Sequence, residues 1–121
     1  MSAFKTALIV DDISTNRKLL NMLVSRQGID VVEAVDGKDA VEQFAANEID
    51  IVFMDIMMPV MDGFEATRQI RASAKGQQVK IIMVTALDGE DNVSKGLQAG
   101  ADLYITKPYR ANEILSVLTE D

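Results

Sequence analysis

Short apolar runs alternate along the chain with segments whose apolar residues recur every three or four positions. The runs predict strands, and the intervening pattern predicts amphipathic helices. The five runs are Thr6–Val10, Asp30–Val35, Ile49–Met54, Lys80–Val84 and Asp102–Ile105. The third and fourth are apolar almost throughout, which predicts central strands buried on both faces. Glu33 interrupts the second run, so we expect that strand at an edge of the sheet.

Five helices are expected between and after these strands. The first has Ser14 or Thr15 as its N-cap and Gly28 just past its C-cap, at the C′ position. The second is expected from the Asp36–Gly37 turn to about Asn47. The third is expected after Asp62–Gly63, with Phe64, Thr67, Ile70 and Ala74 on one face. The fourth is expected over roughly Glu90–Ala99, and the fifth from about Ala111. The fourth is intrinsically weak, because an interior glycine such as Gly96 costs ~0.8–1 kcal/mol relative to alanine.

Five strand–helix units with short connections predict a parallel sheet with helices on both faces. The expected fold class is α/β, a flavodoxin-like (βα)5 doubly wound three-layer sandwich. Its five-stranded sheet would have the order 2-1-3-4-5. The strand order then reverses between the first and third strands, and this reversal is the topological switch point of the sheet. At 121 residues without linker or repeat, residues 1–121 are expected to form a single domain.

Composition narrows the classes of function. With 48% apolar and 26% charged residues the chain is an ordinary globular protein, and its net charge of −7 argues against direct binding to nucleic acid or anionic membrane. The absence of cysteine and histidine excludes disulfides, thiolate metal sites, a histidine base and a phosphohistidine on this chain. The apolar run at the N-terminus is too short for a signal peptide or a membrane span, so the cytoplasm is the expected location.

Acidic residues stand at the ends of two strands. Asp11 and Asp12 follow the first, Asp55 follows the third, and Pro59 stops the third strand from continuing. The predicted strand order brings these three carboxylates together where such folds bind ligands. Two carboxylates about 4 Å apart repel by ~4 kcal/mol at an effective dielectric near 20, so the group needs a cation. Oxygen ligands without histidine or cysteine select a hard ion, and Mg²⁺ is expected.

Two further strand ends complete a possible phosphoryl site. Lys107 follows the fifth strand and supplies an ammonium, and Thr85 ends the fourth and supplies a hydroxyl donor. A carboxylate nucleophile, a divalent cation, a lysine and a hydroxyl together can accept a phosphoryl group. Taken singly, each residue has a simpler interpretation: Asp11 and Asp12 begin a helix, and Thr85 and Lys107 merely end strands.

Four segments carry a resemblance to a known family. They are LIVDD at 8–12, VFMDIMMPVMDG at 52–63, IIMVTA at 81–86 and GADLYITKPY at 100–109. With these segments in order, each at a strand end, the chain resembles over its whole length the receiver domain of two-component response regulators, in particular the single-domain chemotaxis regulators. The resemblance implies that Asp55 is the phosphoacceptor in a Mg²⁺-dependent reaction, with Mn²⁺ as a substitute ion.

The resemblance also implies roles for the surrounding residues. Asp12 would bind Mg²⁺ directly, Asp11 largely through water, and the Met57 carbonyl would be another ligand. Thr85 and Lys107 would hold phosphoryl oxygens, with Lys107–Pro108 as a cis peptide. Movement of Thr85 and rotation of Tyr104 would carry the signal to the face made by the fourth helix, fifth strand and fifth helix. Without the resemblance, Tyr104 is simply a core aromatic residue.

The implied partners are proteins. The phosphoryl donor would be a phosphohistidine of a histidine kinase or a histidine phosphotransfer protein, and a downstream protein target would read the result. The chain would be a monomer or a phosphorylation-dependent dimer, a receiver without an output domain. It would not be an enzyme in the usual sense, since it would catalyse only its own phosphorylation and slow autodephosphorylation.

Three alternatives use some of the same residues. A phosphatase of the haloacid dehalogenase type also has an aspartyl nucleophile, a threonine and a lysine, but it needs an acid two residues after the nucleophile, where this chain has Met57. A nucleotide-binding module would need a glycine-rich loop after the first strand, where this chain has DDISTNR. A pseudo-receiver would bind partners without phosphorylation, although all five site residues are present.

Two apolar residues concern the lifetime of the modification. Met57 and Leu87 stand two positions after the phosphoacceptor and two after Thr85. In the family, these side chains flank the path of the hydrolytic water. Our hypothesis is that bulky apolar groups there hinder that water and lengthen the life of the acyl phosphate.

Overall fold

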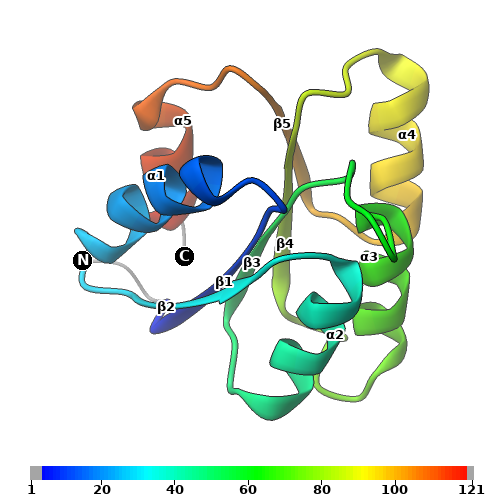
Figure 1. Cartoon of the computed structure of the whole chain (residues 1–121), viewed down its shortest axis with the longest axis horizontal. Helices are drawn as coiled ribbons and strands as arrows, with labels where there is room; N and C mark the ends of the chain where they lie inside the picture. Colours follow the sequence, from blue (N-terminus) through cyan, green and yellow to red (C-terminus); the bar gives the residue numbers. More distant parts are fainter. Residues whose placement is uncertain (1–3, 120–121) are drawn as a thin grey trace.

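One parallel sheet lies at the centre of the computed structural model, which describes residues 4–119 (Figure 1). Its strands are β1 (Thr6–Val10), β2 (Asp30–Ala34), β3 (Ile51–Met54), β4 (Lys80–Thr85) and β5 (Leu103–Thr106). They lie in the order β2-β1-β3-β4-β5 and every neighbouring pair is parallel. The predicted fold class and strand order are therefore confirmed, and the strand that carries Glu33 is at an edge as expected.

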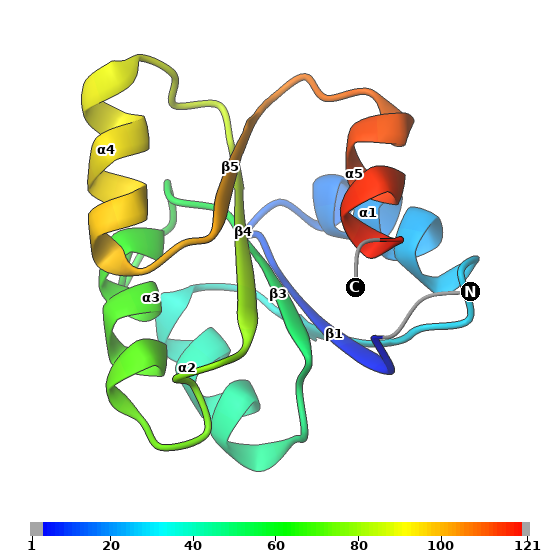
Figure 2. The ribbon, with the colours of Figure 1, turned by 180° about the vertical axis from the view of Figure 1, so that it is seen from behind.

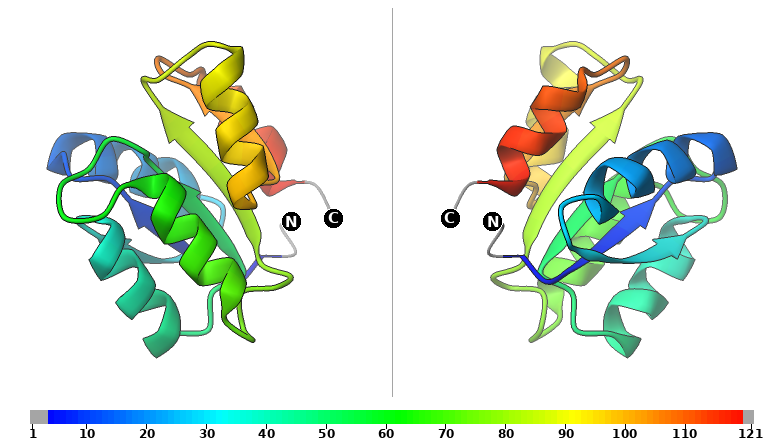
Figure 3. Two further views of the ribbon diagram at one scale, coloured as in Figure 1. Left: turned by 90° about the vertical axis from the view of Figure 1, so that its right-hand side faces the viewer. Right: turned by 90° about the vertical axis from the view of Figure 1, so that its left-hand side faces the viewer.

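Helices cover both faces of this sheet. They are α1 (Ser14–Ser25), α2 (Gly37–Ala46), α3 (Gly63–Ala72), α4 (Glu90–Ala99) and α5 (Ala111–Leu118). Figures 1 and 2 show α1 and α5 together on one face and α2, α3 and α4 on the other. The two side views show the twist of the sheet, in which the β1 and β4 arrows point in clearly different directions (Figure 3). Among residues 4–119 no helix is long and apolar enough to cross a membrane.

The core is divided by the sheet into two layers. Successive side chains of a strand point to opposite faces, so Leu8 and Val10 pack under α2 and α3, whereas Ala7 and Ile9 pack under α1 and α5. All four residues are almost completely buried. A strand buried on both faces has no polar side to display, which is why the inner strands read as continuous apolar runs in the sequence.

Several local boundaries differ from the expectation, two of them at the ends of α1. Neither Ser14 nor Thr15 caps α1, because the position before the helix is Ile13, whose N–H is bound by the Asp11 carboxylate at 2.9 Å. Gly28 is the second residue after the C-cap Arg26 and has φ +79, so it occupies the position after C′.

The other differences have side-chain causes. Helix α3 ends at Ala72 and leaves Ala74 outside, because Ser73 is extended and its hydroxyl bonds the Ile70 carbonyl at 2.6 Å. Strand β3 begins at Ile51 and not at Ile49. The Asp50 carboxylate accepts the N–H groups of Lys5 and Thr6, at 2.8 and 2.9 Å, and so ties the entry of β3 to that of β1.

Two glycines are required by close approach. A Cβ on Gly63 would lie 2.1 Å from the carbonyl oxygen of Asp55, so only glycine lets the start of α3 pack directly on the end of β3. A Cβ on Gly96 would lie 2.7 Å from Met83 Sδ and 3.0 Å from the Tyr104 ring. The glycine that weakens α4 by propensity therefore lets this helix approach the aromatic ring on β5.

Arg71 of α3 connects this helix with the α3–β4 loop and the α4–β5 loop. Its guanidinium donates hydrogen bonds to the carbonyls of Gly76, Val79 and Gly100, at 3.0, 2.5 and 2.8 Å. It also pairs with the Asp102 carboxylate at 2.9 Å, and the same carboxylate accepts the N–H of Ile81. The side chain is 19% exposed, so these loop carbonyls depend on it for their hydrogen bonds.

Replacing Arg71 by methionine should lower the free energy of unfolding by about 2–3 kcal/mol, because several acceptors lose their donor at once. Urea unfolding followed by circular dichroism measures this. The matched control is Arg68→Met, which removes the same charge from a pair whose side chains are 55% and 45% exposed and should change stability by less than about 0.5 kcal/mol. Equal effects of the two variants would contradict the interpretation.

Candidate metal and phosphoryl site

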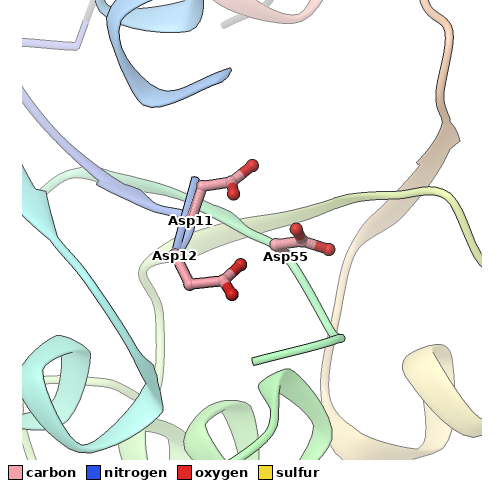
Figure 4. A group of neighbouring side chains, drawn as sticks. All are labelled: Asp11, Asp12 and Asp55. Atoms are coloured by element: carbon pink, nitrogen blue, oxygen red, sulfur yellow. The ribbon is translucent and has the colours of Figure 1, made fainter. Parts of the chain in front are cut away.

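The side chains of Asp11, Asp12 and Asp55 converge at the carboxyl edge of the sheet (Figure 4). Strands β1 and β3 are neighbours with Val10 opposite Met54, so the residues that follow them come out side by side. One carboxylate oxygen from each aspartate lies within 4.8 Å of the others. The structure thus brings together the three acids that the sequence analysis placed at one crevice.

Asp55 is one of the two buried acids of the site. It is 7% exposed, its N–H donates to the Val10 carbonyl at 3.0 Å, and its Oδ1 accepts the N–H of Ile56 at 2.7 Å. Burial raises the pKa of Asp55 above its ordinary value, the charge of Lys107 opposes this shift, and the nearby charge of Asp11 adds to it. The site therefore holds a carboxylate that is poorly solvated and has a charged lysine as partner.

Lys107 bridges two of the acids. Its Nζ donates to Asp11 Oδ2 at 2.7 Å and to Asp55 Oδ2 at 3.2 Å. The residue follows β5, its N–H bonds the Thr85 carbonyl at 2.8 Å, and the Lys107–Pro108 peptide bond is cis. Burial alone would lower the pKa of Lys107, but the hydrogen bond to Asp11 and the charge of Asp55 raise it above its ordinary value, so the ammonium stays charged.

Thr85 and Tyr104 lie beside the acids without bonding them in this structure. The Thr85 hydroxyl is buried and accepts the N–H of Leu87 at 3.3 Å. The Tyr104 hydroxyl donates to the Leu87 carbonyl at 2.7 Å, and burial raises the pKa of this phenol. Among residues 4–119, neither side chain makes a hydrogen bond to the three aspartates. Met57, two residues after Asp55, is 58% exposed.

The donor set fits a magnesium ion. Three carboxylates supply oxygen ligands alone, and no second group of this kind occurs among the described residues. Opposite ligands of Mg²⁺ lie about 4 Å apart, since each bond is about 2.0–2.1 Å long, so the spacing of these oxygens suits an ion that also keeps several waters. Asp12 is exposed, and within residues 4–119 its carboxylate accepts no hydrogen bond from a protein donor.

Arg17 was not identified from the sequence. It lies on α1 and donates to the main-chain carbonyl of Asp11 at 2.8 Å and to the Glu33 carboxylate at 2.8 Å. The one sequence signal for it was the charged Glu33 in an otherwise apolar strand, which we interpreted only as the mark of an edge.

A family model for the response regulator receiver domain matches residues 7–119. Protein PilG of Pseudomonas aeruginosa is 34% identical over 111 residues, which cover 92% of this chain and 82% of the relative. The similarity therefore extends over nearly the whole described chain.

Solved structures give the same result. The chemotaxis protein CheY4 of Vibrio cholerae superposes with a TM-score of 0.89 at 28% identity, covering 96% of this chain and 97% of the other. The receiver domain of a sensor histidine kinase from Pseudomonas aeruginosa superposes with a TM-score of 0.87 at 34% identity, covering 96% and 95%. That structure has a magnesium ion coordinated in its active-site cleft.

The raised pKa of Asp55 predicts a stability change with pH. Ionising a carboxyl group whose pKa is raised by folding destabilises the fold as the pH rises above the ordinary value of 3.8. Asp55→Asn removes that charge, so at pH 7 without metal it should be more stable than the unchanged protein, by about 1 kcal/mol. The gain should vanish below pH 3.8, where the carboxyl group is protonated in both states.

Urea unfolding across this pH range measures the difference in stability, with Asp91→Asn as the exposed control. A loss of stability at pH 7 in Asp55→Asn would contradict this account.

Proposed function

Because this chain belongs to the family of response regulator receiver domains, we propose that Asp55 accepts a phosphoryl group from a phosphohistidine of a histidine kinase or a histidine phosphotransfer protein. The observation that carries the proposal is the position of Asp55. It is a buried carboxylate held by a main-chain N–H on one oxygen and by Lys107 on the other, next to two further acids. A buried carboxylate with a lysine partner and two further acids beside it supports the role of a nucleophile that reacts with an anion.

The transfer needs one bond exchange. A carboxylate oxygen of Asp55 attacks the phosphorus, the bond between phosphorus and the imidazole nitrogen of the donor breaks, and that nitrogen leaves with the electron pair and takes up a proton. The product is an acyl phosphate on Asp55 and a neutral histidine on the partner. Burial favours the attack, since few waters have to leave the carboxylate first.

The remaining residues make the approach of one anion to another possible. Asp11 and Asp12 would hold Mg²⁺ together with Asp55 and the Met57 carbonyl. When bound, that ion neutralises charge on the acids and on the phosphoryl oxygens. Lys107 would move its hydrogen bond from the Asp55 oxygen to a phosphoryl oxygen, which it can do because its Nζ has three donors and Asp11 keeps it in place. The Thr85 hydroxyl would donate to another phosphoryl oxygen.

The same contacts support a route for the signal. Thr85 bonds the N–H of Leu87, whose carbonyl accepts the hydroxyl of Tyr104, and the Tyr104 ring touches Gly96 of α4. Movement of Thr85 toward a phosphoryl group would break the bond to Leu87 and alter the packing of Tyr104. The face made by α4, β5 and α5 would then change its contacts with a downstream protein or with a second copy of the chain.

Phosphorylation by a small acyl phosphate tests the proposal directly. The protein incubated with acetyl phosphate and Mg²⁺ should gain the mass of one phosphoryl group, measured by intact mass spectrometry. Asp55→Asn and removal of Mg²⁺ with EDTA should each abolish the adduct, whereas Asp91→Asn, which removes an exposed carboxylate, should keep it. Steady turnover of added phosphoesters without an adduct would favour the phosphatase interpretation, and binding of partners without any adduct would favour the pseudo-receiver.

The lifetime of the adduct should depend on Met57 and Leu87. Met57 is exposed two residues after Asp55, and Leu87 is partly buried against the core and bonds the Thr85 hydroxyl through its N–H. Replacing them by Asn and Glu respectively should speed phosphate loss several-fold, because a polar pair can orient the attacking water. Phosphate release after removal of the phosphodonor measures the rate. Val60→Asn, a polar substitution on the same loop at 77% exposure, serves as the control. An unchanged rate in the double variant would contradict the hypothesis.

A further inference from the structure

A clamp of three polar side chains lies behind the acidic site. Arg17 Nε donates to Glu33 Oε1 at 2.8 Å, and Arg17 Nη1 donates to the carbonyl oxygen of Asp11 at 2.8 Å. Asn21, one helical turn further along α1, donates to Glu33 Oε2 at 2.7 Å. The clamp therefore joins α1, the edge strand β2 and the end of β1, and its one contact with the site is a main-chain carbonyl.

The main-chain and carboxylate groups of Asp11 all make hydrogen bonds. Its N–H bonds the Ala34 carbonyl of β2 at 3.2 Å, its Oδ1 accepts the N–H of Ile13 at 2.9 Å, and its Oδ2 accepts Lys107. Arg17 supplies the bond to the remaining carbonyl. Asp12 lies between two residues fixed in this way, and its own carboxylate points toward Asp55 (Figure 4). The backbone that orients the two acids is thus held by hydrogen bonds within the chain itself.

We propose that Arg17, anchored by Glu33, is a positioning residue that orients Asp11 and Asp12 for binding the divalent cation. The inference deepens the proposed function and rests on it for the identity of the ion. Arg17 does not touch the ion or the phosphoryl group. It acts through the carbonyl of Asp11, and so it lowers the conformational cost of gathering carboxylates around one cation.

The clamp differs from an ordinary surface ion pair. The Arg17 side chain is 13% exposed and Glu33 is 32% exposed, whereas the Arg68 and Glu65 side chains are 55% and 45% exposed. Hydrogen bonds from Arg17 and Asn21 lower the pKa of Glu33, so its carboxylate remains charged and both of its oxygens are used. An exposed ion pair contributes ~0–1 kcal/mol to stability and leaves its side chains free to move. A largely buried guanidinium with two hydrogen-bond partners holds a fixed geometry.

Charge and positioning predict opposite effects when Arg17 is removed. The guanidinium is a positive charge close to the acids, so its loss would by Coulomb attraction alone tighten the binding of a cation. If Arg17 instead orders the Asp11–Asp12 backbone, its loss weakens binding. Removal of Glu33 alone weakens cation binding under both accounts. Removal of both residues leaves the net charge unchanged, so that double variant isolates the loss of order.

The experiment measures Mg²⁺ affinity by isothermal titration calorimetry at fixed pH and ionic strength, on the unphosphorylated full chain. Arg17→Met should weaken Mg²⁺ binding roughly 10-fold, the usual scale for residues that orient metal ligands. Arg17→Met combined with Glu33→Met should show about the same loss. Arg17→Lys should recover part of it, since an ammonium reaches one acceptor but not both. Arg68→Met removes the same charge at an exposed site and should bind Mg²⁺ as the unchanged protein does.

A second readout separates positioning from stability. With acetyl phosphate as donor, Arg17→Met should need roughly 10-fold more Mg²⁺ for half-maximal phosphorylation but approach the normal rate at saturating Mg²⁺. Urea unfolding identifies the folded fraction of each variant. If Arg17→Met does not fold, Arg17→Lys carries the test, because it keeps the charge but reaches only one of the two acceptors, so weaker Mg²⁺ binding reports positioning alone. A double variant with normal Mg²⁺ affinity, or an Arg17→Met protein that binds Mg²⁺ equally well or more tightly, overturns the inference. An unchanged protein that binds Mg²⁺ but takes up no phosphoryl group overturns the proposed function and leaves the clamp standing.

Discussion

Electrostatic repulsion at one edge of the sheet is the constraint on which the rest of the structure depends. Three carboxylates lie within a few ångströms of one another, and a single ammonium, that of Lys107, lies between two of them. The carboxylates exceed the ammonium by two charges, which is the charge of one Mg²⁺ ion. Selection for stability alone would replace such a cluster of like charges. Its presence therefore marks a site where stability is given up for binding and reaction.

The scaffold has to hold these groups against their own repulsion. Adjacent parallel strands deliver Asp11 and Asp55 from rigid positions, and both strands are buried on both faces. Gly63 lets α3 start directly against the Asp55 carbonyl, and main-chain N–H groups occupy one oxygen of each buried acid. Asp12, the acid without such a donor, is also the exposed one. The geometry is therefore prepared in advance, and the ion or phosphoryl group has little left to reorganise.

The segment that follows β4 is built differently from the acidic site. Thr85, Leu87 and Tyr104 form a short chain of hydrogen bonds that ends on a ring packed against α4. The contact is close because Gly96 has no side chain, and the same glycine lowers the intrinsic stability of that helix. The acidic site and an intrinsically weak helix are thus joined by a few contacts, as the proposed signalling function requires.

The sequence by itself determined the strand order, the edge position of β2 and the meeting of Asp11, Asp12 and Asp55. The strands follow from periodicity, the edge position of β2 from its charged Glu33, and the strand order from the usual arrangement of a doubly wound fold, which brings the ends of β1 and β3 together. The N-cap of α1 was predicted wrongly, because the helix already begins at Ser14 and its N-cap position is Ile13, whose N–H the Asp11 carboxylate binds. Only the tertiary structure decided that Lys107 bridges Asp11 and Asp55 and that Arg17 clamps the Asp11 carbonyl against Glu33. Lys107 and Asp11 are 96 residues apart, and the reach of a long side chain to a particular acceptor leaves no periodic signal in a sequence.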